Sequence, residues 1–268
     1  MSVTAEPAAP AYLIPPAPSA WHRLNPLTRL VVATVTAINA TLLGGVIGPV
    51  VLTVVAVAVP GLVAGVLVRL LRTGLLLALP LAISVLVVNV LFFPSGNTLL
   101  FQVGPITATV EGLAFAVETL VRLVAITGAL ALFYLTTPIG SLVVDLERRG
   151  VSPRMAFVVS SAVRAVPAIV ERARQITDAQ RARGLDTEGS LWRRVRGIVP
   201  LVGPVLLGSI GEVEERAMAL EARGFSRAGR RSLLWAPADH GWERLVRWLL
   251  ALSVPALVVA GLAGWLPR

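Results

Sequence analysis

Long apolar runs divide the chain, and each is separated from the next by a short turn or a charged segment. The runs lie at about residues 27–43, 46–68, 75–93, 120–135 and 245–266. A helix that crosses roughly 30 Å of hydrocarbon needs about 20 largely apolar residues. The pattern therefore predicts an all-α integral membrane protein with about five transmembrane helices.

The second predicted span contains Pro49 and Pro60, and the third contains Pro80. Proline lacks a backbone N–H and clashes with the preceding helical turn, but neighbouring helices can satisfy the groups that it frees. We therefore expect kinks at these positions. Asn39 and Asn89 are polar residues within spans, and we expect each to hydrogen-bond to another helix.

Arginines mark one side of the predicted spans. They precede or begin the first span at Arg23 and Arg29, and they lie between the second and third at Arg69 and Arg72. A further arginine-dense segment follows the fourth span, whereas residues 94–105 carry no charge. Because basic loops are retained in the cytoplasm, the pattern predicts a cytoplasmic amino terminus, and five spans place the carboxyl terminus outside.

These patterns predict four parts along the chain. Residues 1–22 are rich in proline and lack the basic start and unbroken apolar stretch of a secretory signal peptide, so we expect a disordered, uncleaved cytoplasmic tail. Residues 23–136 form a membrane domain with four helices, and residues 242–268 form a carboxyl-terminal transmembrane helix. Between them, residues 137–241 hold most of the charged side chains and are predicted to form long cytoplasmic amphipathic helices.

Composition supports a membrane protein and narrows its chemistry. The 268 residues are 56% hydrophobic and only 15% charged, with a mean hydropathy of +0.79, whereas charged residues make up about 25% of ordinary soluble domains. All 24 basic residues are arginine, so the chain lacks the lysine that ends a nucleotide-binding P-loop. It has no cysteine and only two histidines, far apart in sequence. We therefore expect no bound metal, no cofactor and no catalytic site.

The charged segment contains two long helical patterns. The first runs from Ser152, a typical N-cap residue followed by proline, to Arg183. Its apolar residues form one stripe and its charged residues another face, so it is expected to be too polar to cross a membrane, and Pro167 should bend it. The second runs from about Leu191 to Arg223 and is expected to be interrupted at its internal prolines.

The two helical patterns have the same ending, repeated after forty residues: Ala182, Arg183 and Gly184 in the first, and Ala222, Arg223 and Gly224 in the second. Glycine just past a helix end supplies the left-handed C-cap, and arginine in the last turn interacts favourably with the helix dipole. Two well-capped helices are thus the simplest interpretation. The duplication favours a second one, in which each exposed guanidinium pairs with a carboxylate in one of two similar sockets on partner proteins.

Several short motifs lie in order along nearly the whole chain. They are Asn25-Pro-Leu-Thr-Arg29 before the first span, Glu111-Gly112 and Arg122 around the fourth, Thr136-Thr137-Pro138 after it, and Arg216-Ala-Met-Ala-Leu-Glu-Ala-Arg-Gly-Phe225 at the end of the second charged helix. With these motifs the chain resembles the transmembrane T component of energy-coupling factor (ECF) importers. That family includes the membrane subunits of cobalt and biotin transport.

The resemblance implies a scaffold in the inner membrane of a bacterial or archaeal cell. It implies long coupling helices that bind two ABC-type ATPase subunits, which hydrolyse the ATP, and a small substrate-binding membrane subunit, the S component. In that family the arginine of each Ala-Arg-Gly ending docks in a groove on one ATPase, which here implies Arg183 and Arg223. The solute would be a vitamin or a transition-metal ion, chosen by the S component.

Three charged residues lie in or beside the fourth predicted span. Glu118 and Arg122 are four residues apart, which is the spacing of a helix ion pair, and unpaired charges in a membrane are expensive. Mutual neutralisation is the simplest interpretation. The match to the family pattern allows a second one, in which Glu111, Glu118 or Arg122 fixes the fourth helix or contacts the S component.

Two other classes of function remain open. A membrane enzyme acting on a phosphorylated lipid would use arginines to hold phosphate, but it would also need acids or histidines arranged to handle a metal or protons, and the acids here are interleaved with arginines on helices. A basic membrane anchor for nucleic acid is suggested by the net charge of +9. Because the arginines lack aromatic interleaving, retention of basic segments in the cytoplasm explains them better, and no nucleic-acid partner is expected.

Overall fold

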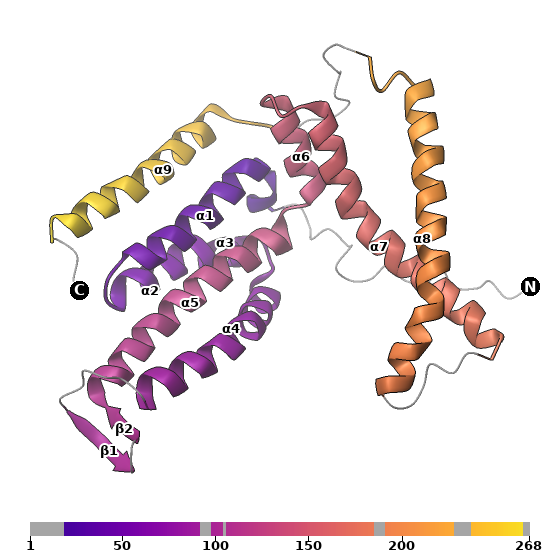
Figure 1. Ribbon diagram of the computed structural model, residues 1–268. Coiled ribbons are helices and arrows are strands. Elements are labelled where there is room, and N and C mark those ends of the chain that lie inside the picture. Colours follow the sequence, from indigo (N-terminus) through magenta and orange to yellow (C-terminus); the bar gives the residue numbers. More distant parts are fainter. Residues whose placement is uncertain (1–18, 92–97, 104–105, 185–190, 228–236, 265–268) are drawn as a thin grey trace, which may run out of the picture. The chain divides into compact units, whose positions relative to one another are not determined.

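The computed structural model describes residues 19–91, 98–103, 106–184, 191–227 and 237–264 (Figure 1). Most of the predicted tail therefore lies outside the described residues. The chain forms two compact units, one made of Met1–Asp145 with Pro237–Arg268 and one made of Leu146–Ala236. Nearly all of the described residues are helical, so the prediction of an all-α integral membrane protein is confirmed.

The first unit contains the helices that correspond to the five predicted spans. Helix η1 (Trp21–Arg23) leads into α1 (Pro26–Leu42), and the second span is built from α2 (Ile47–Thr53), the π-helical turn η2 (Val54–Ala58) and α3 (Val59–Val63). They are followed by α4 (Leu67–Leu91), α5 (Val110–Thr136) and α9 (Gly241–Leu262), and the chain leaves the unit within α6 (Ile139–Arg148).

Four helices are long and apolar enough to cross a membrane: Leu67–Val90, Val110–Thr136, Pro153–Ala182 and Gly241–Leu262. The segments Pro26–Leu42 and Ile47–Val63 are apolar but shorter. The helix that begins at Pro153 is α7 of the second unit, which the sequence analysis expects to be too polar to span. Its apolar residues are concentrated before Glu171 and its charged residues after it, so length and composition alone do not exclude this helix from a membrane.

Two helices begin earlier than the apolar runs predict, because charged residues in their first turns interrupt the apolar pattern. α4 begins shortly after Gly65, whose φ of 68° ends α3 in a tight turn, and it therefore includes Arg69 and Arg72. α5 begins after Thr109, whose hydroxyl oxygen accepts a hydrogen bond from the N–H of Gly112 at 3.2 Å.

α5 lies at the centre of the first unit, where it packs against α1 and α4, while α9 packs against α1 (Figure 1). Small side chains occupy much of these interfaces, including the buried Ala33, Ala125 and Ala129. A Cβ atom on Gly128 of α5 would lie 3.0 Å from Cγ1 of Val57, so this glycine lets η2 approach α5 closely. Close packing of small residues is how helices associate in lipid.

The prolines of the second span are accommodated by a π-type turn. The N–H of Val59 donates to the carbonyl of Val54, five residues earlier, directly before Pro60. A proline clashes with the carbonyl four positions before it, and the wider turn changes the helical register at this point. Pro49 lies in the first turn of α2, where N–H groups lack intrahelical partners in any case, and Pro80 lies inside α4, which continues through it.

The two asparagines within spans behave differently. Nδ2 of Asn39 in α1 donates to Oγ of Ser253 in α9 at 2.8 Å, which confirms the predicted contact between helices. Nδ2 of Asn89 instead donates at 2.9 Å to the carbonyl of Val85 on its own helix, so the prediction for Asn89 is wrong. A side-chain amide can reach the carbonyl one turn back, which satisfies it without a second helix.

A two-stranded antiparallel hairpin connects α4 to α5, formed by β1 (Leu99–Val103) and β2 (Ile106–Thr109) (Figure 1). Val103 pairs with Ile106 at the turn, and the register shifts between Leu99 and Phe101. The hairpin overlaps residues 94–105, the segment without charge between the third and fourth predicted spans.

The second unit is built mainly from α7 (Pro153–Ala182) and α8 (Leu191–Ala222), which cross each other (Figure 1). α7 begins as predicted, because the hydroxyl oxygen of Ser152 accepts a hydrogen bond from the N–H of Met155 at 3.3 Å. α7 continues through Pro167. α8 is also one continuous helix of 32 residues, so the expected interruption at its internal prolines is wrong. Each proline removes only one donor from so long a helix.

Candidate functional site

The first Ala-Arg-Gly ending closes α7. Arg183 is the C-cap residue, and its N–H donates to the carbonyl of Gln180 at 3.0 Å. Gly184 has a φ of 90°, and its N–H donates to the carbonyl of Arg181 at 2.9 Å. Ala182, Arg183 and Gly184 are all exposed, so the helix end is capped by its own backbone and presents the guanidinium to its surroundings.

The second ending closes α8 in the same way. Gly224 has a φ of 73°, and its N–H donates to the carbonyl of Glu221 at 2.9 Å. The N–H of Phe225 donates to the carbonyl of Leu220, also at 2.9 Å, which completes a Schellman motif. Ala222, Arg223 and Gly224 are exposed. Within the part of the chain that the structure describes, neither Arg183 nor Arg223 forms an ion pair, so both guanidinium groups are available to a partner.

An ion pair marks the point where α7 and α8 cross. Nη2 of Arg172 lies 2.6 Å from Oε2 of Glu212, and the hydrogen bond and positive charge of Arg172 lower the pKa of the Glu212 carboxyl. Arg216 binds the other carboxylate oxygen at 2.5 Å. Arg172 precedes Arg183 by eleven residues, and Glu212 precedes Arg223 by the same number. At 1.5 Å per residue, both endings lie roughly 16 Å from the crossing.

The two endings lie on opposite sides of this crossing. The ring of Phe225, just after the second ending, packs edge-to-face on Phe157 in the first turns of α7, with 4.9 Å between ring centroids. The end of α8 therefore lies beside the start of α7, and the end of α7 points the other way. Two endings in this arrangement can be up to roughly 30 Å apart, which is wide enough to engage two separate partners.

Unit 2 also exposes a large apolar surface. On α7 it includes Met155, Val158, Val159, Val166, Ile169 and Val170, and on α8 it includes Val202, Leu206, Leu207, Ile210 and Val213. An exposed apolar patch of this extent indicates contact with another protein or with lipid.

The charged residues of α5 divide between two places. Glu118 and Arg122 form the ion pair that their spacing predicts, and Oε1 of Glu118 also accepts a hydrogen bond from the N–H of Gly45 at 2.6 Å. This carboxylate therefore ties α5 to the turn after α1. Glu111 does not join them, because its carboxylate accepts hydrogen bonds from the N–H and hydroxyl of Thr98 beside the hairpin.

Arg29, which marks the cytoplasmic side in the sequence analysis, is a buried structural residue. Its Nη2 donates to the carbonyl of His22 at 2.8 Å and its Nε donates to the carbonyl of Leu24 at 3.2 Å, while Nη1 binds the carbonyl of Thr136. The indole N–H of Trp21 donates to the hydroxyl of Thr136 at 3.1 Å. Burial and the charge of Arg29 lower the pKa of the His22 imidazole. Of the predicted tail, the structure describes residues 19–22, and Trp21 and His22 of these belong to η1.

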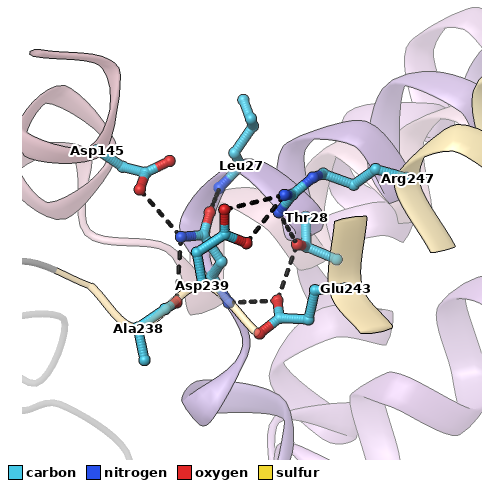
Figure 2. Close-up of polar contacts among 8 residues, drawn as sticks. Leu27, Thr28, Asp145, Ala238, Asp239, Glu243 and Arg247 are labelled. Carbon is cyan, nitrogen blue, oxygen red and sulfur yellow. Dashed lines mark hydrogen bonds and ion pairs between the residues drawn. The ribbon is translucent and has the colours of Figure 1, made fainter. Parts of the chain in front are cut away.

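A buried polar network, which the sequence analysis misses, joins the start of α1 to the start of α9 (Figure 2). Glu243 is fully buried, and its Oε2 accepts hydrogen bonds from the backbone N–H of Asn25 and the hydroxyl of Thr28, both at 2.8 Å. Arg247 donates to the Thr28 hydroxyl oxygen at 2.8 Å and pairs with the carboxylate of Asp239 at 2.9 Å. Charges so deeply buried require partners of this kind.

Asn25 extends the network to α6 and to the segment before α9, through Asp145 and Ala238, which are labelled in Figure 2. Its Nδ2 donates to Oδ1 of Asp145 at 3.0 Å and to the carbonyl of Ala238 at 3.2 Å, while its Oδ1 accepts the N–H of Leu27 at 2.9 Å. Asn25 is 1% exposed and Asp145 is fully buried. The available signal in the sequence was the set of charged residues directly beside the fifth apolar run.

No group of three or more histidine, cysteine, aspartate or glutamate side chains among the described residues could hold a metal ion.

Comparison with known proteins identifies the family. The model of the CbiQ family, described as "Cobalt transport protein", matches residues 18–233. The energy-coupling factor transporter transmembrane protein EcfT of Thermosediminibacter oceani is 30% identical over 238 residues, covering 84% of this chain and 88% of that protein. EcfT of Heliobacterium modesticaldum is 33% identical over 242 residues, with coverages of 84% and 88%. EcfT of Leuconostoc gelidum is 33% identical over 151 residues, and the match spans 53% of this chain and 56% of that relative.

The family match includes both Ala-Arg-Gly endings and most of the apolar helices, so it confirms the resemblance first drawn from short motifs. On this evidence the chain belongs to the family of transmembrane T components of ECF transporters, and it is a multi-pass membrane protein.

Proposed function

We propose that this chain is a non-catalytic scaffold that couples two partner ATPases to a small substrate-binding membrane subunit, the S component, in a cell membrane. The observation that carries the proposal is the pair of exposed arginines, Arg183 and Arg223, placed at equal distances from the crossing of α7 and α8. Each guanidinium would form a bidentate pair with a carboxylate in a groove on one ATPase. ATP would be bound and hydrolysed by those partners.

The crossing suggests how movement would pass through the scaffold. Because Arg172 and Glu212 tie the two helices together, a displacement of one ending would be resisted or followed by the other helix. Equal lengths from crossing to ending would give two similar ATPases similar leverage. The exposed apolar residues of α7 and α8 would then cover, and move with, the S component. Glu118 and Arg122 are a secondary candidate contact for the same subunit or serve only to fix α5.

The solute is proposed only as a class. The name of the matching family mentions cobalt transport, whereas the names of the relatives mention no solute. We propose uptake of a transition-metal ion or a vitamin, selected by the S component.

Co-purification tests this function most directly. The tagged chain would be extracted from its native membrane in a mild detergent, and the proteins recovered with it identified by mass spectrometry. Two ATPase subunits with P-loops and one small integral membrane protein are expected. Reproducible recovery of the chain alone would contradict the proposal and shift weight to a membrane enzyme acting on a phosphorylated lipid.

A further inference from the structure

The buried network lies where the chain passes between its two units. The first unit ends at Asp145 on the way out and resumes at Pro237 on the way back. Asn25 contacts both points, because its Nδ2 donates to Asp145 and to the carbonyl of Ala238, one residue past Pro237. These partners are 120 and 213 positions from Asn25 in the sequence, so a single side chain gathers three distant segments.

We propose that Asn25 is a positioning residue that clasps both passages of the chain to the start of α1. Asp145 and Ala238 would then stay fixed to the membrane helices, and residues 146–236 would move by pivoting at these two points. For the role in transport, this inference rests on the proposed function, because the movement would be driven by the ATPases. The existence of the clasp itself does not depend on it.

The chemistry of the asparagine side chain suits this task. Its amide has two N–H donors, and one is used for each passage of the chain, while its carbonyl oxygen caps α1 through Leu27. Aspartate could cap the helix but could not donate, and it would face the carboxylates of Asp145 and Glu243. Because Asn25 is only 1% exposed, losing one of its hydrogen bonds would be costly, since water cannot readily take the place of the lost partner.

The second half of the network fixes the other side of the return passage. Asp239 follows Ala238 directly and is held by Arg247, which lies 8% exposed in α9. Glu243 in turn holds the backbone of Asn25. The clasp is therefore anchored in α1 and α9, two helices that pack against each other, and not in a surface loop.

Asn25→Ser separates the clasp from the helix cap. Serine is as good an N-cap residue as asparagine, so α1 keeps its cap, but its hydroxyl is too short to reach both Asp145 and Ala238. Asn39→Ser is the matched control, because Asn39 is a buried asparagine of the same helix that contacts α9 at Ser253, away from both passages.

The measurement is the distance distribution between two spin labels. The chain has no cysteine, so Ala251→Cys in α9 and Asp178→Cys in α7, both at exposed positions, give one label on each unit. Asn25→Ser should widen the distribution about twofold without nucleotide, and in the complete complex it should at least halve the change produced by ATP and Mg²⁺. Asn39→Ser should alter neither. Unchanged width and ATP response in Asn25→Ser would overturn the clasp.

The two proposals fail in different ways. If the labelled wild-type chain recovers no ATPase, the proposed function fails, while the width without nucleotide still decides the clasp. If Asn25→Ser does not accumulate in the membrane, Asp145→Ala should widen the distribution and Asp145→Asn, which keeps an acceptor for Asn25, should not. Equal widths for these two Asp145 variants would also overturn the inference.

Discussion

At the residue scale, each Ala-Arg-Gly ending joins two roles in adjacent positions. The glycine adopts a positive φ, which lets the helix close on its own carbonyl groups, and the arginine before it is left exposed. The backbone conformation of the glycine therefore ends the helix directly after the arginine, whose side chain stays exposed. The simple interpretation as helix caps and the functional one as docking groups are both compatible with this arrangement, and variants can separate them.

Gly224→Ala tests the capping role. The φ of Gly224 is 73°, and a Cβ there would meet nothing within 4 Å, so the expected loss of about 1–2 kcal/mol in stability comes from backbone strain alone. Gly211→Ala in the same helix is the control, because it also meets no neighbour but lies inside α8, and it should stabilise the helix by about 0.5–1 kcal/mol. Thermal unfolding in detergent should show opposite shifts, and shifts of the same sign would contradict the assignment.

Charge reversal at the arginines tests docking. Arg183→Glu and Arg223→Glu should each reduce ATPase recovery by about tenfold or more, which corresponds to about 1.4 kcal/mol of binding, because a carboxylate socket would repel the new charge. The double variant should lose more than either single one if there are two sockets. Arg174→Glu, at a side chain that is 74% exposed on α7, is the control and should bind normally. Full recovery with the double variant would refute docking through these ends.

At the element scale, the pair of Arg172 and Glu212 should make the crossing of α7 and α8 sensitive to acid. The pKa of Glu212 is lowered in the folded chain, so its stabilisation is present above the unfolded-state value of about 4.3 and is lost as the pH falls through the lowered value. Spin labels at Asp178→Cys and Met218→Cys, both exposed, should show a narrow distance distribution at pH 7 that widens below about pH 4. When Arg172→Met is added to the labelled chain, the distance distribution should already be wide at pH 7. If the width of this variant still changed with pH, the pH dependence would have to come from groups other than Glu212.

Helices also show which features the sequence could and could not predict. Apolar runs located a helix for each of the five predicted spans, because side chains in contact with lipid must be apolar along a whole helix, but only three of these helices are long and apolar enough to cross a membrane. The same method placed the start of α4 too late, since Arg69 and Arg72 in its first turns break the run. The π-type turn before Pro60 depends on how η2 packs against Gly128, which no local pattern encodes.

The features of the site that could not be predicted from the sequence depend on contacts between residues far apart in the chain. The twin endings were predictable because glycine and arginine at a helix end act locally. The clasp was not, because Asn25 and Glu243 meet across 218 positions, and each is an ordinary polar residue beside an apolar run when taken alone. The sequence offered only the family motif that begins at Asn25 and the charged residues beside the fifth apolar run, and their physical meaning appears only when α1, α6 and α9 are assembled.

At the scale of the whole molecule, the buried network constrains how the chain can cross a membrane. Asn25 binds both Asp145 and Ala238, so the chain leaves the first unit and returns to it on the same side. Residues 146–236 must then cross the membrane an even number of times. α7 is apolar enough to cross, but α8 is not among the helices that qualify in the described part of the chain. A single crossing by α7 would therefore be incompatible with the network, and the cytoplasmic location of this segment stays a prediction.

Thiol labelling provides the test of this topology, because the chain has no cysteine of its own. In intact cells, a membrane-impermeant maleimide should label Thr98→Cys beside the hairpin, and it should label Arg69→Cys and Asp178→Cys only after permeabilisation. All three positions are exposed, so burial would not mask a thiol. Labelling of Asp178→Cys in intact cells would mean that α7 spans the membrane. Since one crossing would place Asp145 and Ala238 on opposite sides, that result would contradict the network around Asn25 as well as the docking of cytoplasmic ATPases.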